Sequence, residues 1–334
     1  MESENNKCKK HFMPIWQAYA CGTGEAFAKS FKDAEERDVA LAAHLYFQGK
    51  LPEAMALCAP LRESESLEIQ LSALLIHMMA CVPLGDAASE HLDVYKFQSI
   101  SQKAETEEQR AMLRFIQSIS HVFFHSDEKL NLVKLDWLGK LPMGVRLFAL
   151  YGIAHGLYLY KDYAQSLGVA RAALIMADDR YPPACIYLNL MASIAAMNLN
   201  EIEQADGFFL RAWSLAESDG YLHPFAEHHG MLQGQVERHF RDRNPALYKQ
   251  ISALVVRFSR GWMKIHNPIS DNKVTDTLSP YEFSVAMMAA KGKSNQEIAD
   301  YMSVSVASVK AYLTVIYQKV GVNNRNELAR YVNK

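Results

Sequence analysis

Residues 278–332 read LSPYEFSVAMMAAKGKSNQEIADYMSVSVASVKAYLTVIYQKVGVNNRNELARYV, and this stretch decides how the C-terminal part of the chain folds. A first helix is predicted from Pro280, because proline at the first helical position lacks only a backbone donor that the first turn does not use. Ser279 or Asp276 can cap that helix with a side-chain oxygen. Gly292 ends it, since glycine readily adopts the left-handed conformation that follows a helix.

Three more helices are predicted in the same stretch. Ser294 and Glu297 have the spacing of a capping box, which opens a second helix. Ser305 caps a third helix, which Gly321 closes, and Asn326 begins a short fourth helix. Apolar residues recur in the third helix at spacings of three and four, namely Val306, Val309, Leu313, Ile316 and Tyr317. Two helices joined by a turn of about four residues, the second exposing small, polar and basic side chains, form a helix-turn-helix.

This stretch resembles the C-terminal DNA-binding domain of LuxR-type transcription regulators. The resemblance rests on LSPYE at the start, G-x-SNQEIA at the first turn, SVK in the third helix, KVGV at its end and NR at residues 324–325. These motifs follow the order and spacing of the family over residues 278–332. The resemblance implies a four-helix domain whose third helix enters the major groove of double-stranded DNA.

The resemblance places Lys310, Ala311 and Thr314 where family members face base edges. Lysine is a donor suited to guanine O6 and N7, and threonine offers both a methyl and a hydroxyl group. Lys310 and Thr314 are one helical turn apart and therefore share a face of the helix. The alternative interpretation of Lys310 is an ordinary solvated lysine on an exposed helix.

The same resemblance implies a second set of residues that contact phosphates: Ser294, Asn295, Ser305, Ser308, Tyr312 and Lys319. Hydroxyls and the N-terminal amides of helices hold phosphates without reading base sequence. Two positions depart from the family pattern. Tyr281 stands where the family usually has arginine, and Tyr312 stands where it often has histidine. Tyr281 therefore lacks the cation with which relatives make a contact, whereas Tyr312 keeps a donor.

The fourth helix pairs across a dimer in LuxR-type relatives, which implies a homodimer contact at Arg325, Leu328 and Val332. A dimer would match two DNA half-sites related by two-fold symmetry. The alternative is a helix that only covers the core of its own domain.

Composition and charge agree with a soluble globular protein that binds nucleic acid through its C-terminal part. From Lys273 onward the chain has eight Lys/Arg against five Asp/Glu, whereas the rest of the chain has a net charge of −5. A basic module attached to an acidic body is typical of a tethered nucleic-acid domain. The five cysteines form no C-x-x-C pair, which argues against a disulfide framework or zinc ribbon and predicts a cytoplasmic location.

No signal peptide or membrane span is predicted. No apolar run follows the N-terminal lysines. The longest apolar run, residues 71–84, is shorter than the ~20 residues that a bilayer requires. We therefore expect it to be a buried helix and expect no membrane partner.

Helical patterns also dominate residues 38–265, and strand patterns are sparse. Three segments, residues 41–61, 151–174 and 188–216, share a plan of one helix, a turn and a second helix with an early alanine. The first helices carry Ala43, Ala154 and Ala192, and the second helices carry Ala54, Ala164 and Ala205, where small side chains allow close helix approach. The pattern loosely resembles tetratricopeptide-like (TPR-like) repeats, so an all-α array of helical hairpins is predicted.

A last helix pair is predicted at residues 224–239 and 245–263. Residues 266–276 are polar, contain a proline and lack periodicity, which is typical of a linker between domains. The predicted organisation is an all-α regulatory or sensor domain at 1–265, a linker at 266–276 and the helix-turn-helix domain at 277–334.

No enzyme, cofactor or metal site is predicted. The chain lacks the strand–helix alternation of a receiver domain, the P-loop pattern G-x-x-x-x-G-K-S/T and the nucleophile motif G-x-S-x-G. His223, His228 and His229 lie close together in sequence, but two adjacent histidines point in different directions on a helix. They are interpreted as structural.

Aromatic residues concentrate in the helical hairpins, and Tyr151, Tyr158 and Trp213 form a candidate ligand groove. A concave surface lined in this way can bind a small apolar molecule or a peptide. The alternative, which the abundance of aromatic residues in protein cores favours, is packing within the repeats.

These observations predict a DNA-binding transcription regulator that acts as a dimer. The helical N-terminal part would sense a small molecule or a protein effector, and RNA polymerase would be a further partner if the protein is an activator. The alternative is a TPR-like interaction scaffold or antiactivator, for which DNA binding is secondary.

Overall fold

The computed structural model describes residues 10–124, 135–266, 278–302 and 304–332, and none of these residues lies in a β-strand. The predicted all-α fold is therefore confirmed for the described part of the chain. The predicted linker at 266–276 lies outside the described residues, except for His266, the last residue of a helix.

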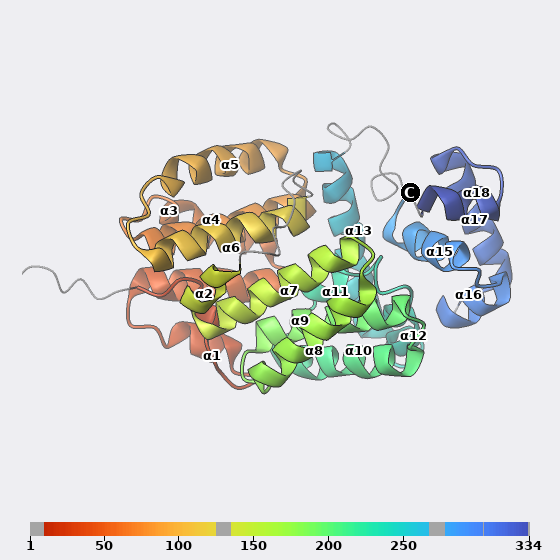
Figure 1. The fold of residues 1–334 in the computed structure, drawn as a ribbon, viewed down its shortest axis with the longest axis horizontal. Helices are drawn as coiled ribbons and strands as arrows, with labels where there is room; N and C mark the ends of the chain where they lie inside the picture. The colour runs from red at the N-terminus through yellow and green to blue at the C-terminus, as the bar shows by residue number, and fades with distance from the viewer. Residues whose placement is uncertain (1–9, 125–134, 267–277, 303, 333–334) are drawn as a thin grey trace, which may run out of the picture.

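Two groups of helices occupy opposite ends of an elongated molecule (Figure 1). The N-terminal part consists of α1 (Gly24–Lys29), α2 (Ala34–Gln48), α3 (Leu51–Leu61), α4 (Leu67–Leu84), α5 (Ala87–Ser101), α6 (Glu107–Phe124), α7 (Met143–Leu159), α8 (Tyr163–Ala177), α9 (Pro182–Asn198), α10 (Ile202–Ala216), α11 (His223–Glu227), α12 (Gln235–Phe240) and α13 (Pro245–His266), with short 3-10 helices η1 (Pro14–Trp16), η2 (Asp136–Lys140) and η3 (Glu217–Asp219). The C-terminal part consists of α15 (Pro280–Ala290), α16 (Asn295–Met302), α17 (Val306–Val320) and α18 (Arg325–Val332).

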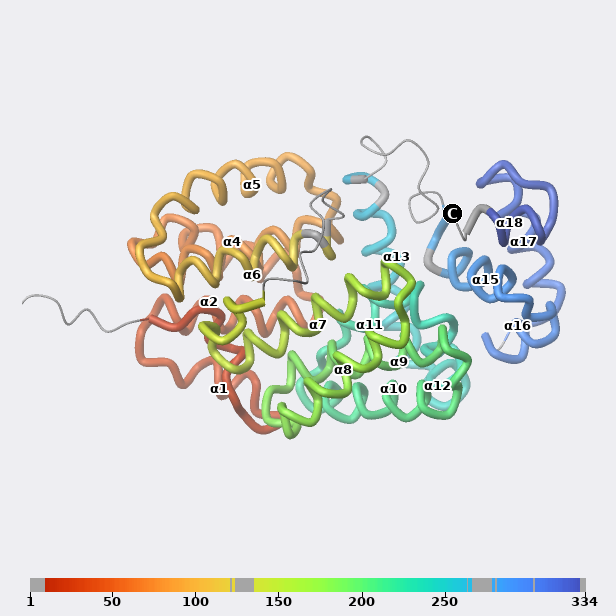
Figure 2. The backbone as a smooth tube through the Cα atoms, viewed as in Figure 1, coloured from red at the N-terminus to blue at the C-terminus, as the bar shows by residue number. Residues whose placement is uncertain are grey.

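The three predicted helix pairs are present as α2–α3, α7–α8 and α9–α10, and the two helices of each pair pack against each other. The course of the chain in Figure 2 shows these pairs following one another along the molecule. α9 packs against α7, α8 and α10, so neighbouring pairs share one core. An amphipathic hairpin alone cannot bury its apolar face, and stacking of the next pair covers it.

Five of the six alanines predicted to lie between paired helices are buried, whereas the prediction is wrong for Ala164. The side chains of Ala43, Ala54, Ala154, Ala192 and Ala205 are no more than 1% exposed. Ala164 is exposed instead, because Asp162 caps α8 and places Ala164 in its first turn. The fourth residue of α8 is Ser166, which is fully buried and donates to the carbonyl of Ala154 at 2.7 Å.

α4 is the central helix of the N-terminal half. It is 18 residues long and apolar enough to cross a membrane, but 94% of it is buried inside the protein. α2, α3, α5, α6 and α13 all pack against it. A helix that is hydrophobic on all sides is stable in water only when neighbours enclose it, so α4 is a core helix, as residues 71–84 predicted.

The predicted single helix at residues 224–239 is wrong. The chain forms α11, a turn over residues 228–234 and then α12. Gln233 and Gly234 have φ angles of 53° and 91°, which no α-helix contains. Glycine adopts this conformation without a steric penalty, so Gly234 is the residue that permits the turn. The following helix, α13, extends three residues beyond its predicted end at Met263.

α15–α18 enclose a separate hydrophobic cluster, whose fully buried members include Val285, Ile298, Val309, Ile316 and Leu328. Ser279 caps α15 as predicted, and Glu282 completes a capping box with it. α18 begins at Arg325, one residue earlier than predicted, because the Asn324 side chain accepts from the Glu327 amide at 2.9 Å.

Replacement of Ser279 by alanine is expected to destabilise α15 by about 1 kcal/mol, because the Glu282 amide loses its side-chain acceptor. Hydrogen exchange of the α15 amides should then accelerate about fivefold, as 1 kcal/mol of lost protection implies. Ser279→Asp keeps a capping oxygen and serves as the control. Equal exchange in the alanine and aspartate variants would contradict this role.

Candidate nucleic-acid interface

α17 has one face in the core and one face in solvent. Val309, Leu313 and Ile316 are at most 5% exposed and pack against α15 and α16. Lys310, Ala311 and Thr314 lie on the opposite side and are exposed. α17 lies at the end of the molecule away from the N-terminal helices (Figure 1). The three residues predicted to read bases therefore share an exposed face that the N-terminal part leaves uncovered.

Hydrogen bonds within α17 fix how two of its polar side chains point. The Thr314 hydroxyl donates to the carbonyl of Lys310 at 3.0 Å. At the start of the helix, the Ser305 side chain accepts from the Ser308 amide at 3.0 Å. The N-terminal turn of α17 is thus capped and presents two hydroxyl-bearing side chains near the surface.

The residues predicted to contact phosphates lie around α17, and several already have partners within the domain. Ser294 forms a capping box with Glu297 through contacts of 2.6 and 3.2 Å. Lys319 pairs with Glu282 at 2.8 Å, so its charge is partly neutralised inside the domain. Tyr312 is half-buried and packs against the domain core.

Arg325 and Leu328 hold α18 onto its own domain. The Arg325 guanidinium donates to the carbonyl of Lys293 and, at 2.5 Å, to the side-chain oxygen of Asn295. Leu328 is fully buried in the domain core. The side chain of Val332 lies outside the described residues. Arg325 and Leu328 therefore have intradomain roles, and the dimer contact remains a prediction.

Tyr281, where the chain departs from the family pattern, makes a contact with the N-terminal helices. Its hydroxyl lies 2.8 Å from the hydroxyl of Tyr248 and 3.3 Å from that of Ser252, both on α13. Its ring packs on His229, with ring centroids 4.8 Å apart. The residue that replaces the family's arginine thus joins α15 to the N-terminal helices.

Tyr301 makes a second contact between the two groups of helices. Its hydroxyl lies 3.1 Å from the sulfur of Met197, and the Arg238 guanidinium lies 5.2 Å from its ring centre. A Cβ atom at Gly234 would lie 3.0 Å from side-chain atoms of Tyr301 and Met302, and the φ angle of 91° also favours glycine at this point of the turn. Tyr281 and Tyr301 each pack against both hydrophobic clusters, and we call this pair of contacts the docking interface.

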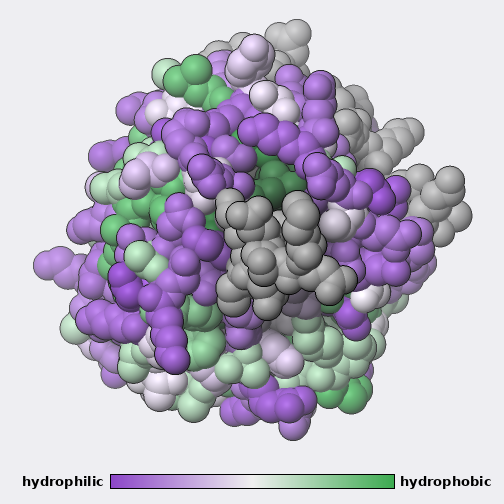
Figure 3. Space-filling view, turned by 90° about the vertical axis from the view of Figure 1, so that its left-hand side faces the viewer, coloured by the Kyte–Doolittle hydropathy of each residue, from purple (hydrophilic) through white to green (hydrophobic). Residues whose placement is uncertain are grey.

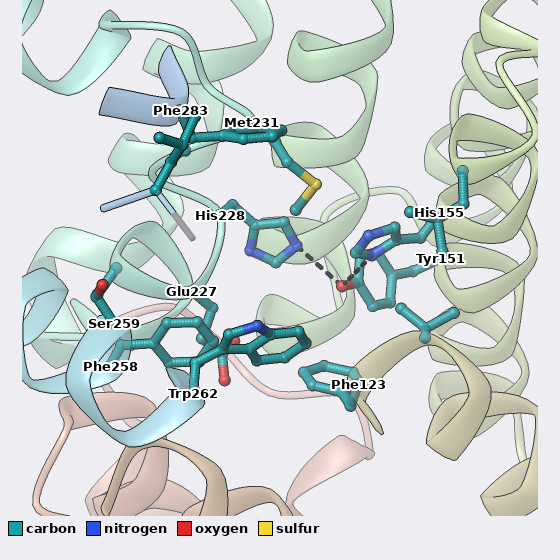
Figure 4. A pocket seen from close by; sticks show the side chains of 15 residues that line it. Phe123, Tyr151, His155, Glu227, His228, Met231, Phe258, Ser259, Trp262 and Phe283 are labelled. Atoms are coloured by element: carbon teal, nitrogen blue, oxygen red, sulfur yellow. Dashed lines mark hydrogen bonds between the residues drawn. The ribbon is translucent and has the colours of Figure 1, made fainter. Parts of the chain in front are cut away.

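A pocket of about 170 Å³ lies beside the docking interface. Its walls come from α6, α7, the α11 region, α13 and the start of α15, and its lining residues are Val122, Phe123, Tyr151, His155, Leu159, Ala226, Glu227, His228, Gly230, Met231, Phe258, Ser259, Trp262, Leu278 and Phe283. Figure 4 shows aromatic rings around a central space, with His228 and His155 on either side of the Tyr151 hydroxyl.

The candidate groove predicted from sequence is only partly at this pocket. Tyr151 lines it, but Tyr158 and Trp213 do not. The Tyr158 ring contacts that of Tyr163 at a tilt, and Trp213 packs edge-on against Phe225 of α11 and Phe240 of α12. His228 is buried and bonds the Pro224 carbonyl, in keeping with the predicted structural role, and it also lies in the pocket wall. The spacing of residues in the sequence did not indicate that His228 lines a pocket, because the turn after α11 sets the direction of its side chain.

A hydrogen-bond chain orders the polar side of the pocket. The ring nitrogen Nδ1 of His228 donates to the carbonyl of Pro224 at 2.7 Å, which leaves Nε2 to accept from the Tyr151 hydroxyl at 2.9 Å. The Tyr151 oxygen in turn accepts from Nδ1 of His155 at 3.0 Å. Burial lowers the pKa of His228 to about 4, so this histidine is neutral near pH 7.

One buried group has the residue types of a metal site. The side chains of His77, Cys81 and Asp93 place their ligand atoms within 4.8 Å of one another. However, Arg62 forms an ion pair with Asp93, and His77 bonds the same carboxylate at 2.5 Å. A guanidinium beside the carboxylate opposes a second cation, and these residues join α3, α4 and α5 as a polar network.

Comparison with known proteins concerns mainly the C-terminal part. The family model described as bacterial regulatory proteins, luxR family, matches residues 276–332. The chain is 35% identical over 66 residues to the putative HTH-type transcriptional regulator YhjB of Escherichia coli, and 34% identical over 85 residues to response regulator Rre1 of Synechocystis. It is 40% identical over 58 residues to the transcriptional regulatory protein ComA of Bacillus subtilis.

These matches cover 20%, 25% and 17% of this chain, and only 33%, 36% and 27% of the respective relatives. No solved structure matches the chain. The family model matches the same residues that form the four helices, their caps and the outward face of α17. Residues 276–332 are therefore a helix-turn-helix domain of the LuxR family.

Proposed function

We propose that the chain is a DNA-binding transcription regulator that reads promoter DNA with α17. The observation that carries the proposal is the exposed face of Lys310, Ala311 and Thr314 on a helix of a LuxR-family domain. A helix presented in this way fits the major groove, where side chains on one face reach base edges. Lys310 donates to a guanine, and the methyl group of the exposed Thr314 contacts a base.

Around this helix, hydroxyl groups and helix N-termini position the phosphate backbone. Ser305 and Ser308 lie at the N-terminus of α17, where the helix dipole favours an anion. Ser294, Asn295, Tyr312 and Lys319 complete the proposed set. Two copies of the domain, paired through α18, would bind two half-sites of a palindromic operator.

The helical N-terminal part controls this activity through the docking interface. An effector can shift the protein between docked and undocked arrangements only if it binds one of them more tightly. The protein acts in the cytoplasm, and an activator would also contact RNA polymerase. The three relatives are regulators by name, which supports a regulatory function for the C-terminal domain.

Mapping of the genomic sites that the full-length protein occupies in its native cell is the experiment that tests this function. The proposal expects discrete peaks at promoters that share a two-fold symmetric sequence. An occupancy that is uniform across the genome, together with stable capture of a protein partner by the N-terminal helices, would favour the interaction scaffold instead.

Binding of promoter DNA is expected to weaken steeply with salt. Each phosphate contact made by a cation releases a counterion, and two such contacts already imply about a tenfold loss of affinity between 50 and 200 mM salt. Fluorescence anisotropy of the full-length protein on a labelled promoter fragment measures this dependence. The two contacts counted here are Lys319 in each subunit of the proposed dimer, and an affinity that stays constant over that range would exclude them.

A further inference from the structure

The pocket beside the docking interface contains an unusual acid. Glu227 lies in the pocket wall, and its side chain is 4% exposed. Its carboxylate accepts from the hydroxyls of Tyr46 and Tyr187, the latter at 2.5 Å. The fifteen described lining residues include no lysine and no arginine. A carboxyl group is therefore buried without the cation that normally accompanies a buried negative charge.

The groups around Glu227 do not replace that cation. His223 lies 3.4 Å from it, but burial lowers the pKa of His223 to about 3, so it is neutral. Arg257 on α13 donates to the carbonyl of Gly49 and makes no ion pair with Glu227. Tyr46 on α2 and Tyr187 on α9 contact the carboxylate through neutral hydroxyl groups.

Burial raises the pKa of Glu227 to about 7, and only the hydrogen bonds from Tyr187 and Tyr46 oppose this rise. Near neutral pH a large fraction of the carboxyl is therefore protonated. A cation that entered the pocket would stabilise the charged form of Glu227 and supply the missing partner.

Aromatic rings form most of the remaining wall. Phe123, Phe258, Trp262 and Phe283 surround the space, and Trp262 and Phe258 stack with ring centroids 5.9 Å apart (Figure 4). The faces of such rings attract cations, and the attraction is strongest where water is excluded. The volume suits one ring with a short substituent, since a cavity of about 150 Å³ holds benzene.

We propose that this pocket is a binding site for a small aromatic or aliphatic amine, whose ammonium group pairs with Glu227 and whose apolar body packs among Phe123, Phe258 and Trp262. Binding of a carboxylate or a phosphate is disfavoured, because the described lining residues include no positively charged side chain. A neutral ligand of the same shape forms no ion pair with Glu227 and should therefore bind more weakly than the amine.

The pocket also connects ligand binding to the DNA-binding domain. Leu278 and Phe283, which belong to the C-terminal part, complete the wall that the N-terminal helices begin. An amine in the pocket therefore contacts both parts and favours the docked arrangement. This consequence rests on the proposed function, whereas the binding site itself does not.

Isothermal titration calorimetry on the full-length protein tests the site without DNA. Three probes of similar size differ in charge: 2-phenylethylamine, 2-phenylethanol and 3-phenylpropanoate. At pH 8 we expect the amine to bind at least tenfold more tightly than the alcohol, and the carboxylate to bind most weakly. The preference should fall towards pH 6, because protonation of Glu227 removes the negative charge that the ammonium group pairs with.

Variants separate the charge from the shape of the pocket. Glu227→Gln should weaken amine binding at least tenfold and leave alcohol binding unchanged, while Glu203→Gln, at an exposed acid on α10, should change neither. Trp262→Leu should weaken binding of both the amine and the alcohol.

An alcohol that binds as tightly as the amine, unchanged amine binding by Glu227→Gln, or no binding of any probe would overturn the proposal. These outcomes leave the DNA-binding function untouched. Loss of DNA binding with intact amine binding would refute the proposed function and not this site.

Discussion

Replacing Lys310 and Thr314 together by alanine is expected to remove most of the protein's preference for its operator over unrelated DNA. The two side chains share the exposed face of α17, and each base contact contributes about 1–3 kcal/mol of discrimination. Two such contacts imply a loss of selectivity of at least about 30-fold for each half-site, and more for a dimer. Competition binding of labelled operator against random-sequence DNA measures this ratio.

The same experiment includes a control on the same helix. Gln318 is exposed near the C-terminal end of α17, and Gln318→Ala should keep the selectivity of the parent protein. Neither substitution removes a buried side chain, so both variants should fold. Unchanged selectivity in the double variant would refute the assignment of Lys310 and Thr314 as base-reading residues.

Loss of the Tyr281 side chain is expected to shift the protein strongly towards an undocked arrangement. Tyr281→Ala removes hydrogen bonds to Tyr248 and Ser252 and the ring contact with His229. A hydrogen bond contributes about 1 kcal/mol, and an aromatic pair contributes about as much. A total of about 3 kcal/mol changes the ratio of docked to undocked protein about 150-fold.

Small-angle X-ray scattering and hydrogen exchange together detect this shift. We expect a larger radius of gyration and faster exchange in α12, which packs against α16 across the docking interface. Tyr95→Ala is the matched control, because Tyr95 is 73% exposed on α5, at the far end of the molecule (Figure 1). That end presents a mainly hydrophilic surface (Figure 3). Identical scattering and exchange in the Tyr281 variant and its control would rule out a stabilising role for this contact.

The helix-turn-helix domain could be located from sequence because its signals are local. Ser279, Ser305 and Gly321 act within one turn of their own helices, and the structure confirms all three as helix caps. Proline at the start of α15 and the apolar spacing in α17 are likewise independent of distant residues. The helix pairs of the N-terminal part followed from the same kind of local pattern.

The turn between α11 and α12 could not be derived in the same way. Apolar spacing continues through residues 224–239, and the break depends on positive φ angles at Gln233 and Gly234. The reason for these angles lies in the fold, because Gly234 leaves room for Tyr301 and Met302. The spacing of apolar residues does not indicate a contact between residues almost 70 positions apart.

The pocket illustrates the same limit. Glu227 and His228 come from the α11 region, Trp262 from α13 and Phe283 from α15, and only the tertiary fold brings them together. Tyr281 was the one sequence signal near the docking interface. Its departure from the family's arginine marked a changed contact without indicating the new partner, which is Tyr248.

Selection of bound sequences from a random DNA library by the full-length protein tests the central claim most directly. The account predicts strong enrichment of one two-fold symmetric sequence, which the Lys310 and Thr314 double variant fails to enrich. A library that emerges from repeated rounds with no enriched sequence would contradict the claim that this protein is a sequence-specific DNA-binding regulator.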